Sequence, residues 1–165
     1  MNSLFAIVLD DHLYLDKADK VYTGIFRLIK NEFEILKKKC PEKFFYEMKN
    51  SIDEAIDLMN EHKNHCILIV DLQMPLDSKY ITRPFRNADF DTLSGTVFLK
   101  YIMKEIKPSI PPVIYSAKYK NQIKSQLERN DLEQIKIFEK NKTEGRKKLI
   151  AHVVSYLKEI CPDAN

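Results

Sequence analysis

The sequence has 165 residues, 44% of them hydrophobic, which suits one domain spanning residues 1–165 with a substantial core. Its 27 basic and 24 acidic side chains leave a formal net charge of only +3, which disfavours a nucleic-acid partner. The apolar runs are far shorter than the roughly 20 residues that span a bilayer, and no basic region precedes the first of them. We therefore expect a cytoplasmic protein with no membrane partner and no secretory signal.

The first part of the chain alternates strand and helix patterns. Residues 4–9 are continuously apolar and predict a buried strand. Apolar residues in steps of three and four then predict an amphipathic helix over 17–39. An aromatic-rich strand pattern follows at 43–48, and Ser51 with Glu54 has the form of a capping box that opens a short helix.

The alternation continues after a long interruption. Residues 66–72 predict a second buried strand around the apolar run at 67–70, but 76–94 show neither period and predict a long loop. The remaining patterns are a helix at 95–107, a strand at 111–116, a polar and exposed helix at 119–129, a strand at 134–138 and an amphipathic helix at 143–160. Five strands that alternate with five helices predict one parallel sheet, because each right-handed crossover is most easily made by a helix.

The three cysteines, Cys40, Cys66 and Cys161, are odd in number and show no CxxC spacing. This pattern favours reduced thiols in a cytosolic protein, with Cys66 as a small core residue at the start of a strand. His62 and His65 lie three residues apart near a helix end, but the histidines and cysteines do not have zinc-site spacing. We therefore expect no zinc site.

Polar residues follow four of the five predicted strands. Asp10 and Asp11 follow the first, Asp71 ends the third, Ser116 ends the fourth and Lys140 follows the fifth. Ligands of such sheets bind beyond the carboxyl ends of the strands, so we expect these side chains to converge. Close carboxylates repel one another unless a cation neutralises them, and hard oxygen ligands suit Mg²⁺ better than zinc. Taken singly, each residue could equally be a helix cap or a solvated strand end.

This ordered set resembles the receiver domain of two-component response regulators. The matching pieces are FAIVLDDH (5–12), LIVDLQMP (68–75), Gly95 at the start of the next helix, VIYSA (113–117) and IFEK (137–140). The resemblance extends from about Leu4 to Leu157. It implies an α/β, flavodoxin-like, doubly wound sheet of five parallel strands in the order 2-1-3-4-5.

The resemblance also implies a role for each matched residue. Asp71 would be the phosphoacceptor, with Lys140 and Ser116 completing the catalytic set. The implied Mg²⁺ ligands are the carboxylates of Asp10, Asp11 and Asp71 and the backbone carbonyl of Gln73. The implied phosphate-binding residues are Ser116, Ala117 and Lys140.

The sequence departs from the family pattern at three points. Asn141 follows Lys140, where the family usually has proline, and Ile137 stands where the family usually has a switching aromatic residue. Tyr115 and Phe138 are close to Ile137, but their side chains should point away from the side that it faces, because side chains alternate along a strand. The 76–94 insertion places Gly95, which opens the third helix, further along the chain from Asp71 than is usual in the family. The inserted segment either covers the pocket, binds a partner or is a tolerated surface insertion.

The resemblance therefore implies a stand-alone response regulator, phosphorylated on Asp71 by a histidine kinase or phosphotransfer protein, that signals through protein–protein interaction and is not a classified enzyme. Its output surface would be the 76–94 loop or the face built by 119–129, 134–138 and 143–160. That face carries a set of basic residues: Lys118, Lys120, Lys124, Lys136, Lys142, Arg146, Lys147 and Lys148. An acidic partner would suit it, although a solvated basic face is the ordinary explanation.

Two other functions compete with this interpretation. A receiver-like scaffold whose binding is independent of phosphate is favoured by Ile137, Asn141 and the loop. A phosphatase of the haloacid-dehalogenase type, which uses an aspartyl intermediate, is disfavoured because its DxD signature is absent after the first strand. There Asp10 is followed directly by Asp11 and His12.

Overall fold

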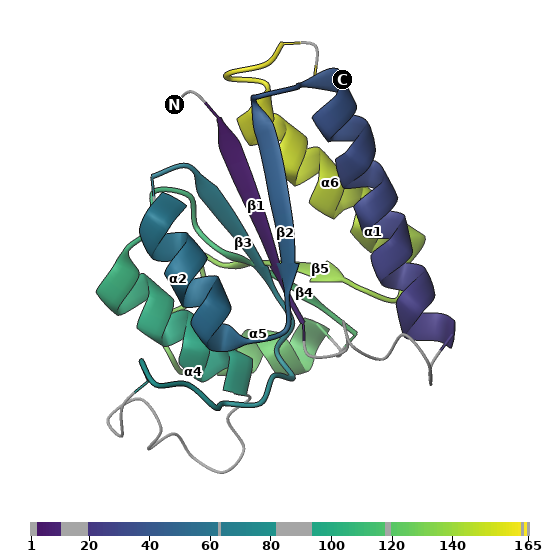
Figure 1. The fold of residues 1–165 in the computed structure, drawn as a ribbon. Helices are drawn as coiled ribbons and strands as arrows, with labels where there is room; N and C mark the ends of the chain where they lie inside the picture. The colour runs from purple at the N-terminus through teal and green to yellow at the C-terminus, as the bar shows by residue number, and fades with distance from the viewer. Residues whose placement is uncertain are drawn as a thin grey trace.

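A computed structural model describes residues 3–10, 20–62, 64–81, 94–117, 120–162 and 164. Five parallel strands form one sheet in the order β2-β1-β3-β4-β5 (Figure 1). The strands are β1 (Leu4–Leu9), β2 (Phe44–Lys49), β3 (Cys66–Val70), β4 (Val113–Ser116) and β5 (Lys136–Glu139). The predicted flavodoxin-like fold, with the strand order 2-1-3-4-5, is confirmed.

The helices also follow the predicted order, with differences at their ends. They are α1 (Lys20–Lys39), α2 (Ile52–His62), α4 (Ser94–Tyr101), α5 (Lys120–Glu128) and α6 (Thr143–Leu157). The helix expected at 95–107 changes after Tyr101 to a π-helical segment, Ile102–Ile106, which ends at Lys107 in the left-handed conformation. Helix α5 is not wholly exposed, because Ile123 and Leu127 are buried against the sheet. None of the helices in the described ranges is long and apolar enough to cross a membrane.

Side chains from alternate positions of the strands pack into two separate cores. In β1, for example, Ile7 and Leu9 join the core under α2, α4 and α5. Ala6 and Val8 join the core under α1 and α6. The two helical layers lie on opposite faces of the sheet (Figure 1). Burial on both faces explains why the central strands are continuously apolar in sequence.

The parallel register brings the ends of the strands to one edge of the sheet. Leu9 pairs with Lys49 on one side and with Val70 on the other. The backbone amide of Asp10 donates to the Lys49 carbonyl at 3.0 Å, and that of Asp71 donates to the Leu9 carbonyl at 3.0 Å. These bonds fix the backbones of both aspartates just beyond the last paired residues.

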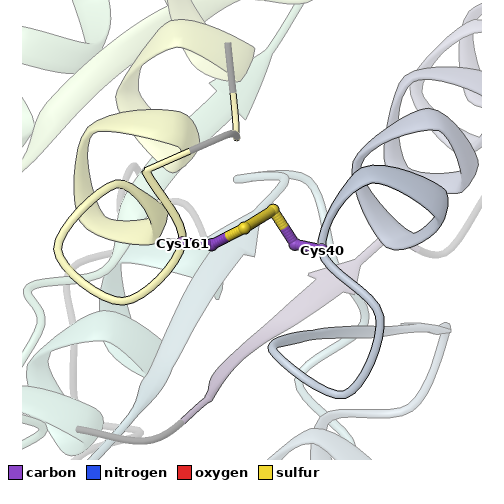
Figure 2. The surroundings of a disulfide bond; sticks show 2 residues. All are labelled: Cys40 and Cys161. Carbon is purple, nitrogen blue, oxygen red and sulfur yellow. A yellow bond between two sulfur atoms is a disulfide. The ribbon is translucent and has the colours of Figure 1, made fainter.

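The prediction of reduced thiols is wrong for two of the three cysteines. Cys40, directly after α1, and Cys161, after α6, form a disulfide with a Cα–Cα distance of 6.2 Å (Figure 2). The two residues are 121 positions apart, and a spacing pattern carries no information about such a tertiary contact. Cys66 is a buried free thiol in β3, as expected for a small core residue.

Candidate functional site

Two buried carboxylates and one buried ammonium group meet at the carboxyl edge of the sheet. Asp10 and Asp71 follow β1 and β3, and Lys140 follows β5. The Lys140 Nζ donates hydrogen bonds to Asp71 Oδ2 at 2.9 Å and to Asp10 Oδ2. Its side chain is fully buried, and the carboxylates are 3% and 5% exposed, so these charges are shielded from solvent. The structure thus brings together three of the residues that the sequence singled out.

The charge of Lys140 depends on its two acidic neighbours. Burial alone would lower the pKa of this lysine, but the nearby carboxylates of Asp71 and Asp10 outweigh burial and raise its pKa above the usual 10.5. Lys140 is therefore protonated at neutral pH. Its single positive charge offsets part of the repulsion between the two carboxylates.

The other oxygen of Asp71 accepts hydrogen bonds from two different donors. The Ser116 hydroxyl, at the end of β4, donates to Asp71 Oδ1 at 2.8 Å. The Gln73 backbone amide donates to the same oxygen at 3.3 Å. Ala117, which follows Ser116, is exposed beside the pocket. Asp71 is thus held by Lys140 on one oxygen and by these donors on the other, which fixes the orientation of its carboxylate.

The oxygen donors of this pocket fit a hard divalent cation. Asp10 and Asp71 supply two carboxylates that converge on the Lys140 ammonium, whose single positive charge offsets only part of theirs. Asp11, the third acidic residue expected as a ligand, lies outside the described residues. Within the described ranges no group of three acidic, histidine or cysteine side chains could hold a metal. Asp10 and Asp71 are the two acidic side chains that the described residues bring together in this pocket.

Phe26 of α1 is part of this pocket, and sequence reasoning did not single it out. Its ring centroid lies 4.7 Å from the Lys140 Nζ, and the residue is only 7% exposed. An aromatic face at this distance stabilises the charged form of a lysine through a cation–π interaction. The contact joins residues 114 positions apart, and helical periodicity marks Phe26 only as an apolar residue.

Phe26 and Lys140 are expected to be energetically coupled. In a double-mutant cycle with Phe26→Leu and Lys140→Met, we expect a coupling energy of about 0.5–2 kcal/mol, because leucine keeps apolar bulk but removes the aromatic face. Urea unfolding of the four proteins measures this quantity. Phe26→Tyr, which keeps a ring, should retain most of the coupling. Additive effects of the two substitutions would show that the ring acts only as packing.

Gly95 allows the start of α4 to approach the backbone that carries Asp71. A Cβ atom at this position would lie 2.5 Å from the Leu72 Cα and 2.8 Å from the Asp71 carbonyl oxygen. The Gly95 amide also donates to the Leu72 carbonyl at 3.0 Å. Only a residue without a side chain fits against this strand end, so Gly95 contributes to the placement of Asp71.

Comparisons with known proteins identify the fold. No family model matches the sequence, and no curated protein matches it. Among solved structures, the chain is similar to the non-phosphorylated receiver domain of the stress response regulator RcsB from Escherichia coli. The TM-score is 0.53 at 19% sequence identity, over 96% of this chain and 95% of that chain. The chain has the receiver-domain fold.

Within this receiver fold, the aromatic residues of β4 and β5 point away from the α2, α4 and α5 layer. Tyr115 and Phe138 pack in the core under α1 and α6, and Ile137 packs on the opposite side. The Tyr115 hydroxyl donates to the Lys140 carbonyl at 3.3 Å, and burial raises the pKa of Tyr115 to about 12. Ile137 therefore packs on one face of the sheet and the rings of Tyr115 and Phe138 on the other, as strand alternation predicts.

The described beginning of the insertion is attached to α2. The Ser78 hydroxyl and the Lys79 backbone amide donate to the two carboxylate oxygens of Asp53, the latter at 3.2 Å. The Tyr80 hydroxyl donates to Asp57 one helical turn further on. Residues 82–93 of the loop lie outside the described residues. Residues 78–80 thus use acidic side chains of α2 as their anchor.

Proposed function

We propose that this chain is a response regulator receiver whose Asp71 accepts a phosphoryl group from a histidine kinase or phosphotransfer protein. The observation that carries the proposal is the arrangement around Asp71: one carboxylate oxygen bonded to Lys140, the other to Ser116, and Asp10 alongside. A buried carboxylate held this way is an oriented nucleophile. The receiver fold supports the same interpretation.

In the proposed reaction, a carboxylate oxygen of Asp71 attacks the phosphorus of a phosphohistidine, and the bond from phosphorus to the imidazole nitrogen breaks. Lys140 stabilises the negative charge on the transferring group, because its ammonium already lies 2.9 Å from Asp71. Ser116 would donate to a phosphoryl oxygen after transfer, assisted by the Ala117 amide.

Mg²⁺ would be held by the carboxylates of Asp10, Asp11 and Asp71 and by the Gln73 carbonyl. When bound, it supplies further neutralisation of the equatorial phosphoryl oxygens. For Lys140 this means a change of partner, since the Asp10 oxygen that it now binds would be directed to the cation. We propose that the Lys140 ammonium then binds the oxygens of the phosphoryl group on Asp71.

The signal would be read by a partner protein. Aspartyl phosphate adds a charge of about −1.5 to −2 at the sheet edge, and Ser116 and Lys140 link that charge to β4 and β5. We propose that output occurs through the adjoining α5, β5 and α6 face or through the insertion. The side chains of Lys118 and Lys120 lie outside the described part of this face, whereas Lys124 and Lys136 are exposed on it. An acidic partner surface would suit these charges, in a cytoplasmic setting.

Phosphorylation of Asp71 is the test of this function. Incubation with acetyl phosphate and Mg²⁺ should add one phosphoryl group to the wild-type mass, and Asp71→Asn should abolish that gain because an amide oxygen is a poor nucleophile. Asp77→Asn, an exposed acid six residues further along, is the matched control and should be phosphorylated normally. The proposal fails if the wild type gains no mass, or if the gain survives in Asp71→Asn.

A second function is favoured by the setting of Ile137. This residue packs in the core under α2, α4 and α5, and the rings of Tyr115 and Phe138 pack on the other side. Phosphorylation would then lack an aromatic relay, and the chain would act as a scaffold whose binding is independent of phosphate. The test compares the affinity of wild type and Asp71→Ala for a binding partner isolated with the wild-type protein. Equal affinities would favour the phosphate-independent scaffold, whereas a lower affinity of the variant would favour the response regulator.

A further inference from the structure

Cys40 and Cys161 join two segments that are distant in sequence. Cys40 terminates α1, and its amide donates to the Leu36 carbonyl at 2.8 Å. Cys161 extends the end of α6 in the same way, with its amide 2.8 Å from the Leu157 carbonyl. Both cysteines belong to the core between α1, α6 and the sheet. The bond therefore locks together the two helices that cover this face (Figure 2).

This crosslink lies at the opposite edge of the sheet from the acidic pocket. The Cys40 carbonyl accepts the backbone amide of Phe44 at the start of β2, whereas Asp10 and Asp71 follow the ends of their strands. The third cysteine does not compete for either sulfur. Cys66 is buried in β3, and burial raises the pKa of its thiol to about 11, which keeps it protonated and unreactive at neutral pH.

We propose that Cys40 and Cys161 are a reversible, redox-responsive pair that gives this chain a second input beside Asp71. The reversibility rests on the proposed cytoplasmic function, because glutathione and thioredoxin keep most thiols reduced there, and the disulfides that do form are redox-active. The exchange partner is a small thiol–disulfide couple such as glutathione and glutathione disulfide. The acidic pocket is too far along the fold to take part in the exchange.

The exchange begins at the more exposed of the two cysteines. Cys161 is 9% exposed and Cys40 is 1% exposed, so the Cys161 thiolate attacks glutathione disulfide and releases one glutathione thiolate. The Cys40 thiolate then attacks the Cys161 sulfur in the mixed disulfide and releases the second. In sum, two protein thiols lose two protons and two electrons, and one glutathione disulfide becomes two glutathione molecules.

Closing the bond stabilises the folded chain and leaves the acidic pocket in place. It joins residues 121 positions apart and so removes much of the conformational freedom of the unfolded state. It also fixes the segment after α6, where the Ala164 amide donates to the Cys161 carbonyl and Ala164 is buried. Reduction releases α1 from this segment at the edge away from Asp71.

The test places the full chain in glutathione buffers of varied oxidised-to-reduced ratio and counts alkylated thiols by intact mass after denaturation. All three cysteines should be alkylated in the reduced buffer and one, Cys66, in the oxidised buffer. The melting temperature should be roughly 5–15 °C higher in the oxidised form. Cys40→Ala/Cys161→Ala should melt at one temperature in both buffers, whereas Cys66→Ala should keep the full difference.

Two results would overturn the proposal. One is three alkylated thiols in the oxidised buffer, which would mean that the pair does not form. The other is a bond that glutathione and a dithiol cannot reduce in the folded chain, which would make it a static crosslink. Phosphorylation of Asp71 by acetyl phosphate, measured on the same samples, separates failure of this proposal from failure of the proposed function.

Discussion

Replacement of Lys140 by methionine is expected to lower the free energy of unfolding by about 3–5 kcal/mol, although methionine fills a similar volume. The ammonium of Lys140 is fully buried and binds Asp10 and Asp71, which are themselves almost inaccessible to solvent. Without it, two carboxylates remain together in a site that water cannot solvate. Urea unfolding of wild type and variant, both with the disulfide intact, measures the difference.

Two further variants separate this explanation from a general loss of a lysine. Lys147→Met changes an exposed lysine of α6 and should alter stability by no more than about 0.5 kcal/mol. Asp10→Asn added to Lys140→Met should recover part of the loss, because it removes one of the two uncompensated charges. If Lys140→Met unfolds at the same urea concentration as wild type, the buried ion pairs do not stabilise the fold.

The contribution of Lys140 should also depend on pH in a defined direction. Its pKa in the folded chain is raised above 10.5, so the folded state holds this proton more tightly than the unfolded state does. The resulting stabilisation is complete below pH 10.5 and is lost as the pH rises through the folded pKa. The stability gap between wild type and Lys140→Met should therefore be constant near neutrality and shrink only at strongly alkaline pH.

Sequence reasoning reached the main features of this pocket because they depend on strand order and strand ends. Asp10, Asp71, Ser116 and Lys140 each follow or end a short apolar segment, and a parallel sheet places such ends together. The continuous apolar strands likewise predicted a sheet that is covered on both faces. These are consequences of local pattern and of the connectivity rules for parallel strands.

The features that sequence reasoning missed are contacts between surfaces that no periodicity relates. Phe26, near the start of α1, contacts Lys140 after β5, and Cys40, at the other end of the same helix, pairs with Cys161. The anchoring of Tyr80 on Asp57 has the same character. In each case both residues have an ordinary local role, as a core ring, a buried thiol or a solvated acid. Only the tertiary arrangement pairs them.

The placement of Lys140 depends in turn on how closely α6 packs on β5. Gly145 lies in the first turn of α6, and a Cβ atom there would be 2.1 Å from the Glu139 carbonyl oxygen and 2.9 Å from the Glu139 carbonyl carbon and amide nitrogen. Those contacts are with backbone, which cannot rotate away as a side chain can. Glu139 is the last residue of β5 and immediately precedes Lys140. The helix and the strand end must separate if any side chain is introduced.

Gly145→Ala is therefore expected to destabilise the chain by about 3 kcal/mol, at the upper end of the range for overpacked sites. Helix propensity alone would predict the opposite, a gain of roughly 1 kcal/mol, so the sign of the effect decides which force dominates. Lys147→Ala, on the exposed side of the same helix, is the matched control and should change little.

The same substitution should disturb the acidic pocket, because moving Glu139 moves the ammonium that binds Asp10 and Asp71. We expect Gly145→Ala to slow the phosphorylation of Asp71 by acetyl phosphate under conditions where the variant is still folded. Normal stability in Gly145→Ala would mean that α6 does not pack this closely on β5. A destabilised variant that is phosphorylated at the wild-type rate would show that Lys140 is placed independently of the helix.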